Sequence, residues 1–171
     1  MSESFSEIFQ AGGHKNTLGR ANEVLRIVLE DRSRLNELYE SIFDDDAWVR
    51  MRAIDVFEKV CREHPDWIEP YIDRLQSDVS SSTQPSIQWH LAQIYMQVRM
   101  NDMQKSHAVT WLKQLQLSSE IDWIAAVNGM KALAYFVQQG DADEADLRRA
   151  ARVLSQHKSN TVQRCAKKYG A

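Results

Sequence analysis

The sequence contains few residues that interrupt secondary structure, with only six glycines and three prolines among 171 residues. A fold of many short strands would need more of these turn formers, so their scarcity favours helices. The two cysteines, Cys61 and Cys165, form no CxxC pair. This spacing argues against a zinc ribbon, a thioredoxin-like motif and a disulfide framework, and it fits a reducing environment.

Long apolar runs are also missing. No uninterrupted run approaches the roughly 18 residues of a membrane-spanning helix, and the first fifteen residues lack the basic and apolar regions of a secretion signal. We therefore expect a cytoplasmic protein that does not associate with membranes. The net charge of -3 gives no overall attraction to nucleic acid. The composition, 43% hydrophobic and 26% charged, is that of an ordinary globular chain.

Motifs for catalysis or metal binding are likewise absent. The histidines are scattered along the chain and do not predict converging metal ligands; they are His14, His64, His90, His107 and His157. There is no glycine-rich phosphate loop and no GxSxG motif. Cys61 and Cys165 adjoin apolar positions, which favours a packing role over a nucleophilic one. The sequence therefore offers no catalytic residue, metal or cofactor, and it indicates a protein that is not an enzyme.

A strong helical pattern begins in the stretch DDDAWVRMRAIDVFEKV, residues 44–60. One stripe of this helix is apolar and consists of Val49, Ala53, Val56, Phe57 and Val60. The acidic triplet is explained by the start of the helix, where Asp45 or Asp46 can accept from free backbone N–H groups. We read this stretch as the beginning of a helix and not as an active site.

The same apolar stripe recurs along the chain. It begins again at Ile87, Ala126 and Val162, at intervals of 38, 39 and 36 residues, and a weaker copy begins at Thr17. A period of this size predicts stacked helical hairpins. The first helix of each pair is expected near residues 33–43, 67–77, 103–117 and 143–156, and the serine-rich segment 77–86 is expected to be an exposed loop.

The best-patterned repeat resembles the HEAT repeat, a helical hairpin of the armadillo-like α-solenoid proteins. In that family, an aspartate in the turn is followed six residues later by an arginine that comes directly after a valine; Asp44, Val49 and Arg50 match. The resemblance implies that Asp44 and Arg50 belong to a structural ladder between repeats. The later copies have other residues at the ladder positions, so this ladder is expected to be incomplete.

The resemblance extends from about Thr17 onward and implies an all-α fold. We expect a right-handed α–α superhelix, or solenoid, of four to five degenerate HEAT-like helical hairpins, with residues 16–171 forming a single domain. Residues 1–15 are expected to be either a flexible segment or a short helix that caps the open end of the stack. Phe5, Ile8 and Phe9 would supply the apolar face of such a helix.

Proteins of this family usually bind partners on a concave face lined by the second helices. The candidate partner-binding residues on this face are Arg52, Asp55, Lys59, His90, Gln93 and Gln97. This mixture of charges and amides suits a peptide or a protein helix better than a phosphate backbone. We therefore expect a non-catalytic protein-interaction module, an adaptor or scaffold, with an unidentified protein partner.

A basic C-terminal segment supports an alternative. Residues 147–171 contain seven lysines and arginines and no acidic residue. The candidate anion-binding residues are Arg148, Arg149, Arg152, Arg164, Lys167 and Lys168. The alternative is a nucleic-acid binding protein similar to the HEAT-like DNA alkylation-repair glycosylases, whose residue types recur here as Arg50, Asp122 and Trp123 without an alignable motif. The other reading of the basic segment is a solvated polar cap.

Overall fold

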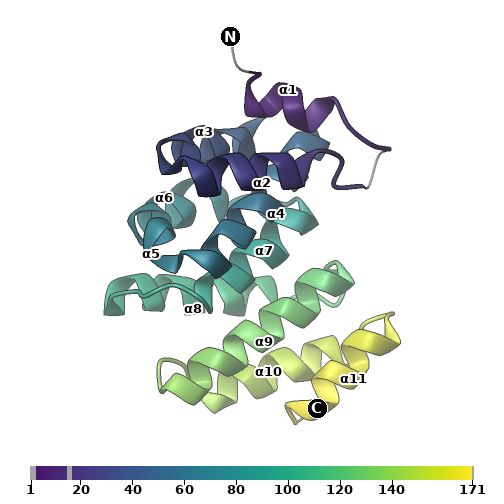
Figure 1. Ribbon diagram of the computed structural model, residues 1–171. Coiled ribbons are helices and arrows are strands. Elements are labelled where there is room, and N and C mark those ends of the chain that lie inside the picture. Colours follow the sequence, from purple (N-terminus) through teal and green to yellow (C-terminus); the bar gives the residue numbers. More distant parts are fainter. Residues whose placement is uncertain (1–2, 15–16, 171) are drawn as a thin grey trace. The chain divides into compact units, whose positions relative to one another are not determined.

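The computed structural model describes residues 3–14 and 17–170, and within these residues every regular element is a helix (Figure 1). The expectation of an all-α chain is thereby confirmed. The contacts divide the chain into two compact units, Met1–Ile68 and Glu69–Ala171. Because each unit is compact in itself, the single domain expected over residues 16–171 stays a prediction.

The first unit is built around one long helix. Its helices are α1 (Phe5–Gln10), α2 (Ala21–Glu30), α3 (Leu35–Glu40), α4 (Ala47–Glu63) and α5 (Pro65–Ile68), with 3-10 turns at Arg32–Arg34 and Ser41–Phe43. Helix α4 packs against α1, α2, α3 and α5. It buries apolar side chains on several sides, including Val49, Ile54, Phe57 and Val60. As the second helix of the best-patterned hairpin, α4 is the centre of this unit.

The acidic triplet fixes the start of α4. Asp46 is the N-cap residue, and its carboxylate accepts from the backbone N–H of Trp48 at 2.7 Å. Asp44 accepts from the backbone N–H of Asp46 at 2.9 Å and from the hydroxyl of Ser6 at 2.6 Å. The interpretation of this stretch as a helix start is therefore confirmed, with Asp46 as the cap.

The N-terminal segment forms a helix in this unit. A capping box between Ser4 and Glu7 begins α1, and Phe5, Ile8 and Phe9 are buried. The backbone N–H of Phe5 also donates to the carboxylate of Glu37 on α3 at 2.8 Å. Of the two alternatives left open by the sequence for residues 1–15, the structure contains the short helix, at residues 5–10.

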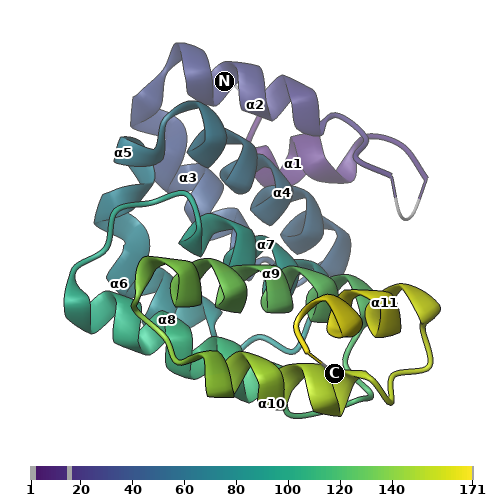
Figure 2. The ribbon, with the colours of Figure 1, turned by 90° about the horizontal axis from the view of Figure 1, so that it is seen from below.

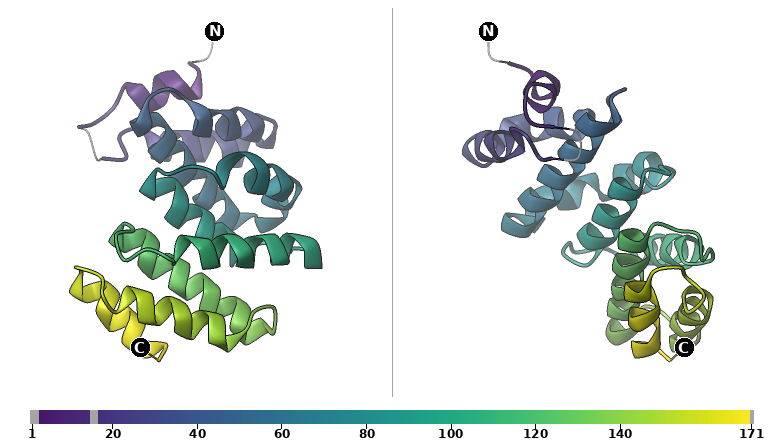
Figure 3. Two further views of the ribbon diagram at one scale, coloured as in Figure 1. Left: turned by 180° about the vertical axis from the view of Figure 1, so that it is seen from behind. Right: turned by 90° about the vertical axis from the view of Figure 1, so that its right-hand side faces the viewer.

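The second unit contains the remaining helices. They are α6 (Ile72–Arg74), α7 (Pro85–Tyr95), α8 (Asp102–Leu115), α9 (Trp123–Gln139), α10 (Glu144–Leu154) and α11 (Asn160–Lys168), with a 3-10 turn at Glu69–Tyr71 and a π-helical turn, η4, at Leu75–Val79. Helix α9 packs against α7, α8, α10 and α11 (Figures 2 and 3). Met130 of α9 is fully buried in a cluster with Leu154 and Val162. The chain order follows the expected hairpins, with α7, α9 and α11 as second helices.

The serine-rich loop is shorter than the sequence predicted. Ser77 to Val79 belong to η4, and Pro85 begins α7, so only residues 80–84 lie between the helices. Val79 is 2% exposed, and its burial holds this end of the segment in a helical turn. Proline is well suited to the first turn of a helix because it lacks a backbone N–H that would be unsatisfied there. The expectation of a loop over the whole range 77–86 was therefore wrong at both ends.

Gly129 allows close packing in the middle of α9. A Cβ atom at this position would overlap the side-chain amide nitrogen of Gln116, which follows α8. Gln116 is fully buried, and its amide has no hydrogen-bond partner among the described residues. A glycine is normally unfavourable inside a helix, so this position shows that packing against the Gln116 amide overrides helix propensity.

We predict that Gly129→Ala destabilises the protein despite the helix propensity of alanine. The propensity gain of about 1 kcal/mol is opposed by overpacking of about 1–3 kcal/mol. The free energy of unfolding in urea should therefore fall. The double variant Gly129→Ala/Gln116→Ala should lose less unfolding free energy than the two single variants lose together. Lys131→Ala, at an exposed position of the same helix, is the control. Additive single effects would contradict this packing argument.

Candidate functional site

Two of the expected partner-binding residues lie together on α4. Lys59 Nζ and Asp55 Oδ2 are 2.8 Å apart, one turn along the helix, and their side chains are 24% and 13% exposed. Trp48 and Met51 are also partly exposed. These four residues are three or four positions apart, so their partly exposed side chains form one narrow stripe along α4.

Arg52 lies in the interior, not on that stripe. It is 3% exposed. Its Nε donates to the carbonyl of Thr17 at 2.8 Å, and Nη2 donates to the carbonyl of His14 at 3.3 Å. Nη1 donates to the carbonyl of Phe9, near the end of α1. The expectation that Arg52 faces a partner was therefore wrong, because the segment after α1 covers this side of α4 and supplies its hydrogen-bond acceptors.

The expected residues on α7 also differ in exposure. His90 is 1% exposed, so its expected position on a binding surface was wrong; a helix packed on two sides buries more than one stripe. Gln93 is half-buried and donates from Nε2 to Oδ1 of Asn128 on α9 at 3.1 Å. Gln97 donates from Nε2 to the carbonyl of Gln93 at 3.1 Å. The amide of Gln93 therefore links α7 to α9, whereas that of Gln97, in the turn after α7, bonds back to the end of α7.

The two residues expected to form a ladder both bond at the turn before α4. Arg50 Nη1 donates to the carbonyls of Asp44 and Asp45, at 2.8 and 2.9 Å. The carboxylate of Asp44 accepts from Ser6 on α1, as described above. Arg50 thus holds the turn before α4, and Asp44 joins that turn to α1. A ladder between successive repeats stays a prediction.

The basic residues of α10 and α11 are all exposed; they are Arg148, Arg149, Arg152, Arg164, Lys167 and Lys168. Arg148 Nη2 lies 2.8 Å from a carboxylate oxygen of Glu144. On α11, a shallow hollow of about 410 Å³ is lined by Asn160, Gln163, Arg164 and Lys167, without a carboxylate. Solvated basic side chains account for this surface, and anion binding stays a prediction.

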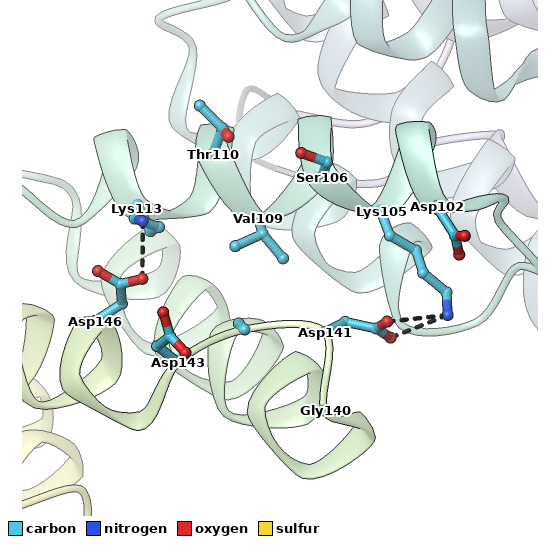
Figure 4. Close-up of a pocket in the computed structure, with 11 residues that line it drawn as sticks. Asp102, Lys105, Ser106, Val109, Thr110, Lys113, Gly140, Asp141, Asp143 and Asp146 are labelled. Atoms are coloured by element: carbon cyan, nitrogen blue, oxygen red, sulfur yellow. Dashed lines mark hydrogen bonds and ion pairs between the residues drawn. The ribbon is translucent and has the colours of Figure 1, made fainter.

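A second hollow, of about 380 Å³, lies between α8 and the turn that joins α9 to α10 (Figure 4). Lys105 Nζ lies 3.0 Å from a carboxylate oxygen of Asp141, and Lys113 Nζ lies 2.8 Å from Asp146 Oδ2. Figure 4 shows these ion pairs at opposite ends of the hollow. Partly exposed pairs of this kind are worth about 0–1 kcal/mol each, so they help to position α10 against α8.

Sequence reasoning missed this charged hollow because its two sides come from segments about 36 residues apart. The available signal was the acidic turn GDADEAD at residues 140–146, which follows the stripe of α9. Within the described residues, no three His, Cys, Asp or Glu side chains gather closely enough to hold a metal ion. None of the described helices combines the length and the apolar character needed to cross a bilayer.

The comparison with known families agrees with the helical hairpins and with the Asp44, Val49 and Arg50 motif. The family model for the HEAT repeat domain matches residues 14–118, more than half of the chain. The chain belongs to the HEAT-repeat family. Comparisons with curated proteins and with solved structures found no match. HEAT repeats generally mediate interactions between proteins.

Three second helices of this HEAT-repeat chain carry a tryptophan near their start. Trp48 of α4 and Trp89 of α7 are half-buried, as expected for side chains that fill gaps between helices. Trp123 of α9 is 49% exposed. Filling a gap between helices therefore describes the first two tryptophans better than Trp123.

We predict that Arg52→Met destabilises the first unit by about 2–4 kcal/mol, since hydrogen bonds to a charged group are worth roughly 1.5–3 kcal/mol and several are lost together. The carbonyls of Phe9 and Thr17 would lose the donor that Arg52 supplies, whereas the carbonyl of His14 would keep its bonds from Thr17. Urea unfolding should show the loss, and amide hydrogen exchange should accelerate in α1. Arg26→Met is the control, because Arg26 is 66% exposed and pairs only at the surface with Glu30. Equal stability of the two variants would exclude an anchoring role for Arg52.

We also predict that the cysteines of the native protein react slowly with a thiol reagent at pH 8. Burial raises the pKa of Cys61 to about 12, so its reactive thiolate is scarce at this pH. Burial also raises the pKa of Cys165, whereas nearby Lys131 and Lys168 oppose this shift. Cys165 should therefore react before Cys61, and both should react rapidly in urea. Rapid labelling of native Cys61 would contradict its role as a packing residue.

Proposed function

We propose that this HEAT-repeat chain is a non-catalytic, cytoplasmic protein-interaction module whose second helices bind a partner protein or helix. The observation that carries this proposal is the 49% exposure of Trp123 at the start of α9. Tryptophan is enriched at the energetic centres of protein interfaces, where it buries a large area at little cost in conformational entropy. An exposed tryptophan on a packed helix is thus a suitable anchor for a partner.

The surface around this anchor is rigid. Helices α7 and α9 pack side by side, and the hydrogen bond from Gln93 to Asn128 joins their polar stripes. Asn128 in turn donates from Nδ2 to the carbonyl of Ile124 at 2.9 Å. Side chains held in this way lose little entropy on binding, which favours affinity.

The partly exposed stripes also indicate the kind of partner. On α9 the stripe includes Val127, Lys131 and Tyr135, and on α7 and the turn that follows it the stripe includes Gln93 and Gln97. Few of these groups are charged, so a phosphate backbone would find few cations here. An amphipathic helix could lay its apolar side on the aromatic groups and place polar groups against the amides.

The proposal includes the expected architecture. In it, the second helices of four to five hairpins line the concave face of a right-handed superhelix, an arrangement favoured by the repeat period of 36 to 39 residues. Asp55 and Lys59 would contribute the charged part of this face. Arg52 and His90, which are buried, would support the surface from behind instead of contacting the partner.

We predict that Trp123→Ser weakens partner binding at least about tenfold, because truncating an aromatic anchor typically costs 2 kcal/mol or more and 1.4 kcal/mol corresponds to a factor of ten. Tagged wild-type protein and variants would be used to capture partners from nuclease-treated native lysate. Mass spectrometry would identify the partner, and calorimetry with the purified partner would give affinities. Circular dichroism would verify that each variant is folded.

The matched control is Leu117→Ser, which also removes an exposed large apolar side chain from the second unit, one that is 60% exposed. It should leave the affinity unchanged. Lys59→Glu tests the stripe of α4, and it should lower the affinity for a partner that contacts this stripe. Retention of every partner by Trp123→Ser would reject the proposed surface. If partners are captured only from lysate without nuclease, their capture depends on nucleic acid, and the basic residues of α10 and α11 become the candidate binding surface.

A further inference from the structure

Positive charge is concentrated at the C-terminal end of the sequence. The whole chain has a net charge of -3, and residues 147–171 contribute +7, so residues 1–146 carry a net charge of -10. In the first unit, cations such as Arg20, Arg34 and Lys59 are paired with carboxylates. A solvated face explains why the basic C-terminal side chains are exposed, but it does not explain why acidic residues are missing among them.

Helix α11 carries part of this charge on its exposed side. Its buried side chains are Val162, Cys165 and Ala166, which join a core cluster with residues of α9 and α10. On the exposed side lies the hollow of about 410 Å³ described above. We call it the α11 hollow; the residues that line it are Asn160, Gln163, Arg164 and Lys167. Their spacing of three, one and three positions places them on one side of the helix.

The two cations of the α11 hollow have no acidic partner within the described residues. Arg164 makes one long contact, from Nη2 to the hydroxyl of Thr161 at 3.5 Å, and Lys167 forms no ion pair there. Lys167 lies in the last turn of α11, where the helix dipole favours a cation. Arg164 lies in the middle of the helix, so the dipole does not account for it. The guanidinium is therefore exposed and available to an external carboxylate.

The start of α11 is anchored to the rest of the unit. His157 is 1% exposed; its Nδ1 accepts from the backbone N–H of Ser159 at 2.9 Å, and its Nε2 donates to the carbonyl of Ile121 at 2.7 Å. Gln163 Nε2 donates to the carbonyl of His157, also at 2.7 Å. One wall of the α11 hollow is thus held in place before a ligand arrives, which lowers the entropy lost on binding.

We propose that the α11 hollow binds an acidic segment of a partner protein. The planar guanidinium of Arg164 can donate two parallel hydrogen bonds to one carboxylate, and Lys167, one turn further along, can pair with a second. The side-chain amide of Asn160 adds a neutral donor. Acidic side chains one helical turn apart, or in an unbroken run, would meet both cations.

A nucleic acid fits the α11 hollow less well than a short acidic segment does. A long polyanion would extend beyond this nine-residue helix, and the chain outside residues 147–171 has a net charge of -10, which repels it. A short acidic segment can end where the cations end. The inference deepens the proposed function, since it rests on the chain being a protein-interaction module, and it adds a contact to that of Trp123.

The test uses a defined acidic peptide in place of the partner. Fluorescein-labelled acetyl-hexaglutamate amide would be titrated with the full-length chain at about 0.1 M salt, where charges more than about 10 Å apart are largely screened. Fluorescence anisotropy should show saturable binding that weakens several-fold at about 0.3 M salt. The matched hexaglutamine peptide should not bind. No binding of hexaglutamate, or equal binding of the two peptides, would overturn the proposal.

The location of the peptide is tested by removing two charges at a time. Arg164→Gln/Lys167→Gln should weaken hexaglutamate binding at least about tenfold. The control Arg149→Gln/Arg152→Gln removes the same charge from exposed positions of α10 outside the α11 hollow, and it should weaken binding about twofold or less. All four side chains are exposed, and circular dichroism would verify that both variants are folded. Equal losses in the two variants would show a response to diffuse charge and would overturn the proposal.

Two further measurements separate this surface from other readings. In the ¹⁵N-labelled chain, the side-chain amide resonances of Asn160 and Gln163 should shift when hexaglutamate is added; unchanged resonances with bound peptide would place it elsewhere and overturn the proposal. A single-stranded thymidylate oligonucleotide of the same charge should displace the labelled peptide less effectively than unlabelled hexaglutamate does. More effective displacement by the oligonucleotide would assign the surface to nucleic acid, which also overturns the proposal.

This test and that of the proposed function fail in different ways. The hexaglutamate probe needs no partner, and Trp123 does not line the α11 hollow. Loss of the partner in Trp123→Ser, with no binding of hexaglutamate, would reject the α11 hollow alone. Specific binding of hexaglutamate, with every partner retained by Trp123→Ser, would reject the surface of α9 and keep the α11 hollow.

Discussion

The burial of the second helices on several sides is the constraint on which both units depend. Helix α4 is in contact with four other helices of its unit, and so is α9 in the second unit. A helix enclosed in this way needs apolar residues over most of its circumference, and it keeps only a narrow partly exposed stripe. That stripe is the part of α4 or α9 whose side chains can change without disturbing the core. The same packing that stabilises each unit therefore determines where recognition can evolve, and it explains why the proposed partner surface is a set of stripes and not a deep cleft.

Three buried polar side chains differ in how their polar atoms are accommodated in the core. Arg52 is satisfied by backbone carbonyls, so its burial organises the segment between α1 and α2. Gln116 packs its amide against the backbone of Gly129, which brings α8 and α9 close together. Tyr95 buries its hydroxyl near the side chain of Gln76. A polar group that is satisfied internally stabilises one conformation, so Arg52 contributes most to the uniqueness of its unit.

The helices were predictable from the sequence because their signals are local. The apolar spacing of residues 44–60 predicted α4, and the acidic triplet predicted its cap, which is Asp46. The exposure of individual polar residues was less predictable. Helical spacing separates an apolar from a polar side, but it does not report a segment that covers the polar side, as at Arg52, or a second packed side, as at His90. The charged hollow was missed for the same reason, because Lys105 and Asp141 meet only when α8 packs against the turn that joins α9 to α10. Contacts of this range depend on tertiary structure, which periodicity does not encode.

The proposed surface of α9 would bind mainly through area removed from water. An exposed indole such as that of Trp123 gains affinity in this way, and the gain depends little on the identity of the opposing side chain. Affinity would therefore depend mainly on the indole, whereas discrimination among similar partners would depend on the polar groups beside it, because a partner that leaves a polar group unpaired is penalised. Since these exposed side chains do not support the core, they could change in evolution while the fold was kept, which is an advantage for a repeat protein whose fold does not determine its partner.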